Sequence, residues 1–361
     1  MTKKERDINA FQSFLYLLVE DTTFAQDQEL SVDLIINPHS GSFNQEKIRK
    51  GIMDELERVT RILPERLDEP RRTGLIHFRT HLTPGPGCET ALVKEILTED
   101  ETPPEARLIL VAGGDGTARY VLEALLHQNE KIQKSTTVFR LPMGTGNDGA
   151  DVGNWEGVAR VLAGNFSQQL IHSWKIEGGG LKEPGYGFNI SSVGLDAYIV
   201  ELNALGRKIL PGNFYTLMTQ VAGLLYGPVV GNPTWDLRFF RQGKEVHRVQ
   251  GDMFLGAFGV TGNRTYGAGK KVLPDHRNIC LVRRAPITKL FKFSELLFAG
   301  LHEQLEWVEL LSADRVEVRA DGKLPANIDG EPFWVEKDAW PLNFTLLDPV
   351  IQVLKPSGEK K

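Results

Sequence analysis

The chain has 361 residues, of which 41% are hydrophobic and 25% are charged, and its formal net charge at pH 7 is −5. This composition is that of an ordinary globular protein, long enough for two domains and a sizeable core. The negative net charge gives no electrostatic reason to expect nucleic acid as a partner. Two cysteines, Cys88 and Cys280, are too few for a disulfide framework and indicate a reducing compartment such as the cytoplasm.

The N-terminal region contains the apolar run FQSFLYLLV. An acidic pair follows it at once and no small-residue cleavage pattern is present, so a signal peptide is not expected. Phe11, Phe14, Leu15 and Leu18 fall at the spacing of one helix face. We expect residues 1–30 to form a helical extension whose apolar face docks on the chain itself. Docking on a second copy of the chain or on a membrane is left open.

Between residues 31 and 168, strand-like and helix-like segments alternate. Four segments predict strands: VDLII, GLIHFRT, RLILVA and TTVFRLP. Amphipathic spacing predicts helices at about 44–63 and 89–97, another after the third strand, and one that begins near Trp155. This alternation is typical of a parallel sheet with crossover helices, so we expect an α/β domain over residues 31–168.

Beyond residue 168 the pattern changes to strand-like runs separated by Gly, Pro or Asn, with helical segments near 195–226 and 287–304. This pattern predicts a second domain over residues 169–340, a mainly antiparallel β-sandwich. The longest apolar run without a charged residue, FYTLMTQVAGLLYGPVVG, contains Gln220 and Pro228 and is only marginally long enough to cross a bilayer. No transmembrane helix is therefore expected.

Three loops that follow strands of the predicted parallel sheet combine glycine with polar residues. NPHSG (37–41) follows the first strand, GGDGT (113–117) the third and PMGTGND (142–148) the fourth. Ligands of open α/β sheets bind beyond the carboxyl ends of the strands. Glycine lets the backbone approach a ligand closely, and helix N-termini favour phosphate. We expect a phosphate-bearing ligand here. Polar side chains that would help to bind it are Asn37, Thr117, Thr145 and Asn147.

Asp115 is the unusual member of these loops. A carboxylate inside an anion-binding loop lowers anion affinity unless it holds Mg²⁺ or takes a proton. A helix cap or a turn is the alternative role. The chain has no G-x-x-x-x-G-K-[ST] motif. Residues 144–149 match G-x-G-x-x-G, but they follow the fourth strand and lack an acidic residue about twenty positions on, which argues against a dinucleotide dehydrogenase.

The blocks NPHSG, GGDGT and LPMGTGND, in this order and spacing, resemble the catalytic domain of the diacylglycerol kinase family, which includes bacterial lipid kinases and sphingosine kinases. FNISSVGLDA, GAGKKVLP and DGE resemble later blocks of the same family. GGDG alone is shared with NAD kinases, and the other blocks favour the lipid-kinase branch. The resemblance covers residues 31–355.

The resemblance implies a kinase with ATP in a cleft between two domains and a last strand, 341–355, that returns to the first domain. Glu331 matches the proton acceptor of the family, and Asp115 would organise Mg²⁺ or share that duty. PDHRNICL (274–281) lacks the Asp-Gly pair of the family's structural cation loop, so no residue is assigned to a metal site. The residues expected to bind ATP are Asn37, Ser40, Gly41, Thr83, Gly113, Gly114, Asp115, Gly116, Thr117, Ala118, Arg119, Gly144, Thr145 and Asn147.

Residues 204–230 are apolar with Arg207 and Lys208 beside them, which suits an acyl-chain groove or an interfacial patch, or equally a helix packed on the β domain. We expect an ATP- and Mg²⁺-dependent kinase of a lipid alcohol such as diacylglycerol, cytoplasmic and peripheral at the membrane surface. One alternative is a soluble kinase of a nucleotide or polar alcohol, as NAD kinases are. Another is a catalytically inactive nucleotide- or lipid-binding regulator, and a homodimer is left open.

Overall fold

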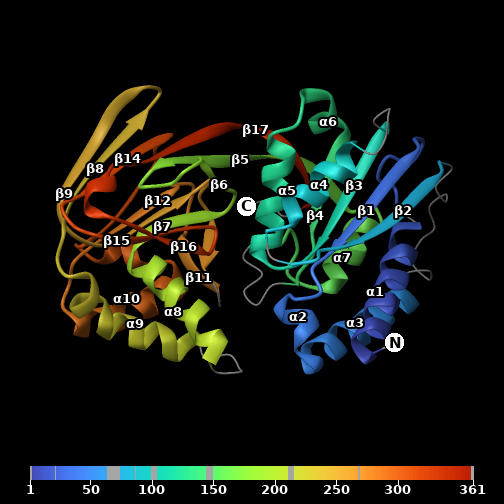
Figure 1. Cartoon of the computed structure of the whole chain (residues 1–361), viewed down its shortest axis with the longest axis horizontal. Coiled ribbons are helices and arrows are strands. Elements are labelled where there is room, and N and C mark those ends of the chain that lie inside the picture. Colours follow the sequence, from blue (N-terminus) through green and yellow to red (C-terminus); the bar gives the residue numbers. More distant parts are fainter. Residues whose placement is uncertain are drawn as a thin grey trace. The chain divides into compact units, whose positions relative to one another are not determined.

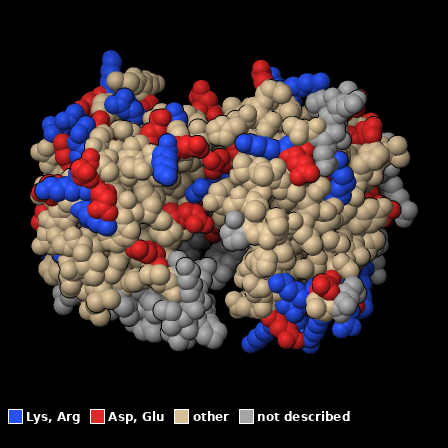
Figure 2. Space-filling view, in the orientation of Figure 1, with Lys and Arg blue, Asp and Glu red and all other residues tan. Residues whose placement is uncertain are grey.

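The computed structural model describes residues 2–20, 22–62, 74–85, 87–98, 104–143, 149–209, 215–266 and 269–358. The chain divides into two compact units: unit 1 is Met1–Ile171 with Pro349–Lys361, and unit 2 is His172–Asp348. The domain boundaries expected at 168/169 and 340/341 stay a prediction. Lys and Arg are interspersed with Asp and Glu on the surface of each unit in the view of Figure 2.

Unit 1 is built on a parallel sheet. Its strands are β1 (Leu30–Ile36), β2 (Ile76–Leu82), β3 (Ala106–Ala112) and β4 (Thr136–Arg140). They lie in the order β4-β3-β1-β2, and β1 pairs in parallel with both β2 and β3. Every residue of β1, β3 and β4 is buried, polar ones such as Asp33 and Arg107 included, as expected of parallel strands covered on both faces. The predicted parallel sheet is confirmed.

Helices cover both faces of this sheet (Figure 1). The helices of unit 1 are α1 (Lys3–Glu20), α2 (Gly41–Asn44), α3 (Glu46–Ile62), α4 (Glu89–Thr98), α5 (Asp115–Leu126), α6 (Glu130–Ser135) and α7 (Trp155–Leu162). Helices α1, α3 and α7 share one hydrophobic cluster with Val32, Leu34 and Leu108 of the sheet. Arg107 alternates with these positions along β3 and donates from Nη1 to the carbonyl of Ile96 in α4 at 3.0 Å, so α4 lies on the opposite face.

The N-terminal helix α1 docks on the chain itself, as its apolar spacing predicts. The Phe11 ring packs edge-on against Phe43 and Trp155, with centroids 5.3 and 5.6 Å apart. Leu15 and Leu18 are fully covered. Asp7 on the same helix forms an ion pair with the nearly buried Arg49 of α3, with Nε and Oδ2 2.6 Å apart. The extension is therefore part of the core of unit 1.

Unit 2 is a sandwich of antiparallel strands. They are β5 (Phe166–Gly178), β6 (Gly185–Gly187), β7 (Ile190–Gly194), β8 (Thr234–Arg241), β9 (Lys244–Gly259), β12 (Ile279–Arg283), β13 (Val308–Leu311), β14 (Arg315–Ala320), β15 (Leu324–Ile328) and β16 (Glu331–Val335), with β10 (Arg264–Tyr266) and β11 (Lys270–Leu273) as a separate pair. The first part of β9 pairs with β8 and its second part with β7 and β12. Trp174, Phe239, Phe258 and Phe344 fill the core between the two halves. The predicted β-sandwich is confirmed.

Strand β17 (Leu342–Pro356) takes part in both units. Its first residues pair antiparallel with β14, and Gln352 and Val353 pair in parallel with Thr137 and Val138 of β4. The last strand of the chain therefore extends the parallel sheet of unit 1.

Three helices, α8 (Leu195–Ile209), α9 (Tyr215–Val230) and α10 (Ile287–Ala299), cover one face of unit 2 (Figure 1). The helical segment expected at 195–226 is two helices rather than one. The segment expected at 287–304 ends earlier, because Gly300 adopts the left-handed conformation (φ 74°) that closes a helix. No helix among the described residues is long and apolar enough to cross a bilayer.

Asp151, shortly after β4, is the centre of a buried group of charges in unit 1. Arg140 Nη2 and Lys355 Nζ lie 2.6 and 2.8 Å from its Oδ1, and the Arg140 N–H donates to Oδ2 at 2.7 Å. Burial by itself would raise the pKa of Asp151, but the two cations outweigh burial and hold this pKa below its ordinary value. Because Lys355 belongs to β17, the ion pairs tie the end of the chain to the segment that follows β4.

Replacing Asp151 with Asn removes the negative charge that these two cations face. We expect the free energy of unfolding at pH 7 to fall by about 3–5 kcal/mol, the usual cost of breaking a buried ion pair. The folded-state pKa is lowered, so the contribution is present above the unfolded pKa and is lost as pH falls through the folded pKa. The difference between the two proteins should therefore shrink below about pH 4. Urea titrations across this pH range measure it, and equal stabilities at pH 7 would contradict the assignment.

Candidate functional site

The loops that follow β1, β2 and β3 lie side by side at the carboxyl edge of the unit 1 sheet. The Asn37 N–H donates to the carbonyl of Ala112, and the Thr83 N–H donates to that of Ile36, both at 2.9 Å. The strand order changes direction between β1 and β3, because β2 lies on one side and β4 on the other. Open α/β sheets bind ligands at this kind of switch point. The fold therefore brings the NPHSG and GGDGT loops together at a ligand-binding position.

One chain of hydrogen bonds joins the three loops. The His39 N–H donates to Asn37 Oδ1 at 2.9 Å, Asn37 Nδ2 donates to Thr117 Oγ1 at 2.8 Å, and Thr117 Oγ1 donates to Glu89 Oε1 at 3.4 Å. The Thr117 hydroxyl proton is thus directed to Glu89 in this arrangement rather than to a ligand. The side chains of Asn37 and Thr117 hold the loops in place, and the backbone N–H groups at the start of α5 remain the natural phosphate donors.

Glu89 was not among the residues expected at the site. It is the first residue of α4 and is buried, and its Oε2 has no hydrogen-bond partner among the described residues. The same holds for the buried hydroxyls of Ser40 and Thr83. Buried polar atoms are normally paired, so three unpaired ones on adjoining loops indicate that a ligand or water supplies the missing bonds. The sequence signal for Glu89 was weak, since an acidic residue in the first turn of a helix is usually solvated.

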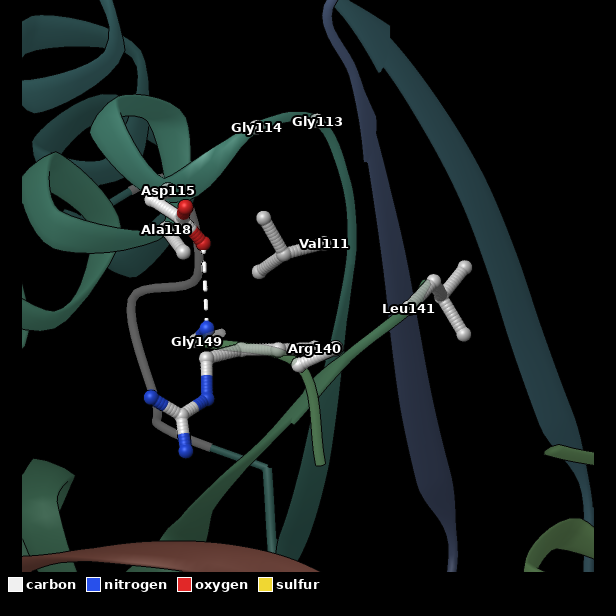
Figure 3. Close-up of a pocket in the computed structure, with 9 residues that line it drawn as sticks. Val111, Gly113, Gly114, Asp115, Ala118, Arg140, Leu141 and Gly149 are labelled. Carbon is white, nitrogen blue, oxygen red and sulfur yellow. Dashed lines mark hydrogen bonds between the residues drawn. The ribbon is translucent and has the colours of Figure 1, made fainter. Parts of the chain in front are cut away.

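Asp115 is the first residue of α5, directly after the N-cap residue Gly114. Its Oδ1 accepts the N–H of Gly149 at 3.1 Å, and Figure 3 shows this bond spanning the hollow between α5 and the segment after β4. The hollow has a volume of about 10 Å³, roughly the room for one water molecule. Its lining consists of Val111, Gly113, Gly114, Asp115, Ala118, Arg140, Leu141, Gly149 and Ala150.

The donor set at Asp115 fits Mg²⁺ only in combination with a nucleotide. No group of three or more His, Cys, Asp or Glu side chains in the described part of the chain could hold a metal ion by itself. Mg²⁺ is commonly bound through one or two carboxylates together with phosphate oxygens and water. A carboxylate at the start of a helix that favours phosphate supplies the protein's share of such a site, and Asp115 is the residue that would hold the ion.

Gly113 and Gly114 have different reasons to be glycine. A Cβ at position 113 would lie 2.6 Å from Cβ of Thr117, so the packing of Thr117 requires a glycine there. A Cβ at position 114 would meet no atom of the described residues within 4 Å, and the backbone there is extended (φ −81°), a conformation open to any residue. The described part of the protein therefore does not require glycine at position 114, whereas close approach of a ligand would.

This difference can be tested with two variants. Gly113→Ala should lower the free energy of unfolding of the ligand-free protein by about 1–3 kcal/mol, the usual cost of overpacking. Gly114→Val should leave the melting temperature nearly unchanged and weaken ATP binding, because its side chain occupies the space in front of the loop. Calorimetric unfolding and ATP titration measure both. A drop in melting temperature for Gly114→Val with unchanged affinity would assign this glycine to the turn alone.

The other residues expected to bind ATP have the following places. Ser40 is the N-cap of α2 and Gly41 its first residue, and Thr83 follows β2 directly. Gly116 and Ala118 lie in the first turn of α5. Arg119 lies along α5 with its Nη2 3.8 Å from Glu123 Oε2. Three expected residues lie outside the described part of the chain: Gly144, Thr145 and Asn147.

Glu331 lies in unit 2, at the start of β16, and Asp115 lies in unit 1. Ile328 pairs with Glu331 across the hairpin of β15 and β16. The two turn residues, Asp329 and Gly330, have φ values of 48° and 90°, as a two-residue type I′ turn requires. Glu331 is exposed, and exposure is necessary for a base that meets a substrate.

Polar contacts hold this turn against the rest of unit 2. Asp329 accepts the N–H of Asn189 at 3.0 Å, and Asn327 Oδ1 accepts the N–H of Gly330 at 3.3 Å. Asn327 Nδ2 and the Ser192 hydroxyl donate to Asp196 Oδ2 at 3.1 and 2.7 Å. Burial raises the pKa of Asp196 despite these donors. The position of Glu331 is therefore coupled through Asn327 to the first turn of α8.

Comparison with known proteins agrees with this fold. Residues 31–173 match the family model described as "Diacylglycerol kinase catalytic domain". The matched segment contains β1 to β4 and all three motif loops. This part of the chain belongs to the diacylglycerol kinase catalytic-domain family, and the resemblance seen in the motifs is confirmed.

Similar proteins extend the match beyond this segment. The diacylglycerol kinase of Staphylococcus carnosus (strain TM300) is 25% identical over 338 residues, 91% of this chain and 95% of that protein. The diacylglycerol kinase of Bacillus subtilis (strain 168) is 24% identical over 271 residues, 70% of this chain and 78% of that protein. A crystal structure of a diacylglycerol kinase from Bacillus anthracis str. Sterne aligns with a TM-score of 0.53 at 15% identity over 90% of this chain and 96% of that one. At this identity the structural likeness concerns the fold.

Glu89→Gln distinguishes a ligand-binding role of Glu89 from a purely structural one, because the two roles predict opposite changes in the stability of the ligand-free protein. If the unpaired carboxylate oxygen is kept for a ligand, the neutral amide should raise the stability of the ligand-free protein by about 1 kcal/mol, because a buried charge is removed. The same variant should bind ATP less tightly. Thermal unfolding and ATP titration are the measurements, with the exposed Glu95→Gln on the same helix as the control. A loss of stability with unchanged ATP affinity would make Glu89 purely structural.

Proposed function

We propose that the protein transfers the γ-phosphoryl group of ATP to the hydroxyl of a lipid alcohol, with diacylglycerol as the first acceptor to consider. The observation that carries the proposal is the meeting of NPHSG and GGDGT at the switch point of a parallel sheet, within a segment that matches the diacylglycerol kinase catalytic domain. The names of the Staphylococcus carnosus and Bacillus subtilis relatives support diacylglycerol as the acceptor.

Unit 1 would bind the nucleotide. The N-terminus of α5 presents backbone N–H groups, and no described residue lies within 4 Å of a Cβ built on Gly114, which would leave room for phosphate oxygens. Mg²⁺ would neutralise charge on the phosphates, with Asp115 as its protein ligand. Phosphoryl transfer depends mainly on positioning and charge neutralisation, so a rigid set of loops and one carboxylate suffice for this half of the reaction.

Unit 2 would supply the proton acceptor. As the oxygen of the lipid hydroxyl forms a bond to the γ-phosphorus, the bond between that phosphorus and the bridging oxygen breaks and ADP leaves. The hydroxyl proton passes to the carboxylate of Glu331. The type I′ turn and its contacts to Asn189 and Asn327 support a fixed position for this carboxylate.

A screen with labelled ATP and Mg²⁺ tests the acceptor class. Diacylglycerol, a sphingoid base, phosphatidylglycerol and a polyprenol are presented in mixed micelles, and glycerol and NAD are presented in solution. We expect label in phosphatidic acid and none in the soluble acceptors. Transfer to a soluble acceptor alone would make the protein a polar-alcohol kinase, and the absence of transfer to every acceptor would support an inactive regulator.

Glu331→Gln and Asp115→Asn should separate chemistry from binding. Glu331→Gln should reduce kcat by about 10²–10⁴-fold, the usual contribution of a positioned general base, with ATP affinity retained. Asp115→Asn should abolish most turnover without unfolding the protein, because it removes the expected Mg²⁺ ligand. Glu336→Gln, at an exposed position just beyond β16, is the matched control. Activity of either variant within a few-fold of wild type would remove that residue from the reaction.

A further inference from the structure

The helices of unit 2 expose large apolar side chains on the face that points away from the sandwich. On α9, Ala222 and Tyr226 are buried against the sheet, whereas Leu224 and Val229 are 65% and 56% exposed. Leu225 next to them is also exposed. The helix therefore packs on the β domain with one side and presents leucine and valine to the surroundings with the other. Of the alternatives that the sequence left open for this segment, packing on the β domain holds for the buried side, and an acyl-chain groove or interfacial patch stays a prediction for the exposed side.

Helix α10 ends with the same kind of exposure. Leu297 is buried in the cluster that also contains Tyr226, and the adjacent Phe298 is 48% exposed. Gly300 ends the helix, and the Leu301 N–H donates back to the carbonyl of Leu296 at 2.9 Å. This closing contact leaves the Leu301 side chain at the end of the helix, exposed.

These five side chains define an apolar face on the helical layer of unit 2. Its members are Leu224, Leu225, Val229, Phe298 and Leu301. Since α9 and α10 bury their inner sides in one shared cluster on one face of the sheet, their outer sides point in the same general direction. In Figure 2, Lys, Arg, Asp and Glu gather over β8 and β9.

Two lysines lie at the α10 end of this apolar face, because Lys270 Nζ is 5.8 Å from the Phe298 ring centroid and Lys271 packs near Gly300. Lys289 and Lys292 are exposed on α10, with Glu295 as the exposed acidic residue of that helix. Lys271 is exposed and packs near Gly300, where a Cβ at position 300 would lie 3.3 Å from its side chain. Exposed apolar side chains bordered by lysines are typical of a surface that lies at the interface of an anionic bilayer.

We propose that this apolar face of α9 and α10 docks the protein on an anionic lipid bilayer. Charge favours lipid over a second copy of the chain, because the lysine-bordered face would meet an identical basic border in a two-fold dimer. The position of the face also favours lipid. Lys270 Nζ lies 5.8 Å from the Phe298 ring centroid, and its charge acts on Asp196, the residue to which Asn327 of the Glu331 turn donates.

Helix α8 gives a second connection to the same turn. Its Glu201 accepts the indole N–H of Trp334 at 2.8 Å, and Trp334 lies on β16, the strand that begins with Glu331. A membrane bound to the helical layer would therefore be close to the hydrogen bonds of Asp196 and Glu201 that support the turn and strand of Glu331. This part of the argument rests on the proposed function, whereas the docking itself does not.

Sedimentation with lipid vesicles tests the docking. Vesicles of phosphatidylcholine alone and with added phosphatidylglycerol are compared, and the partition coefficient is measured for Leu224→Asp and Phe298→Asp. Each change should lower partitioning by at least about tenfold, since the apolar side chain it removes would be buried in lipid. Lys289→Gln combined with Lys292→Gln should weaken binding to the anionic vesicles only, and added salt should mask this effect.

Matched controls come from exposed apolar residues elsewhere. Leu75 in unit 1 and Val246 on β9 are 72% and 53% exposed, so Leu75→Asp and Val246→Asp make the same chemical change away from the face. Partitioning of these controls should stay within about twofold of wild type. Equal losses in controls and face variants, or no binding of the wild-type protein to either vesicle, would overturn the proposal. The proposal would also be overturned if light scattering showed that the wild-type protein is a dimer and that Phe298→Asp is a monomer.

The outcome is separable from that of the kinase proposal. Vesicle binding that depends on Leu224 and Phe298 supports the docking even if no acceptor is phosphorylated. Conversely, with a water-soluble short-chain diacylglycerol the face variants should retain the turnover of wild type. A loss of turnover with that acceptor, with circular dichroism unchanged, would contradict docking as the role of the face and place these side chains in acceptor binding.

Discussion

The candidate site depends on the register of β1 with its two neighbours. Leu30 to Ile36 pair in step with Ile76 to Leu82 on one side and with Ala106 to Ala112 on the other. The three strands therefore end at the same level, and the loops that follow them have to meet. A shift of one residue in either pairing would turn the side chains of a strand to the opposite face of the sheet and move its loop. Helices cover both faces of the sheet, so such a shift would disturb the packing on each face.

The polar groups at that edge are arranged at a cost to stability. Asn37, Thr117 and Glu89 form a chain of hydrogen bonds, but buried oxygens of Ser40, Thr83 and Glu89 have no partner among the described residues. An unpaired buried polar atom destabilises a fold unless a ligand or water pairs with it. Nearby, the buried carboxylate of Asp151 forms ion pairs with Arg140 and Lys355 and so fixes the segment after β4. The paired charges around Asp151 therefore support the site, whereas the unpaired oxygens of Ser40, Thr83 and Glu89 mark the part where a ligand would bind.

Unit 2 combines a rigid turn with an exposed helical layer. Glu331 is exposed at the start of β16 in the hairpin of β15 and β16. Asn327 forms hydrogen bonds with Gly330 of the turn and with Asp196 at the start of α8. The outer side of α9 carries leucine and valine where an ordinary surface helix carries charge, and α10 exposes Phe298 as well as lysines and Glu295. The proposed lipid kinase would use the turn for its acceptor hydroxyl and the helical layer for the bilayer.

The sequence by itself determined the parallel sheet, the sandwich and the loops at 37–41 and 113–117, because apolar runs, turn residues and glycine motifs are local signals. It did not identify Glu89, or the ion pairs of Asp151 with Lys355, because these depend on residues far apart in the chain. Which side of α9 is buried was undecided for a related reason. A helix that is apolar all round has no preferred face until the sheet beneath it covers one side, and only the tertiary structure decides which side that is.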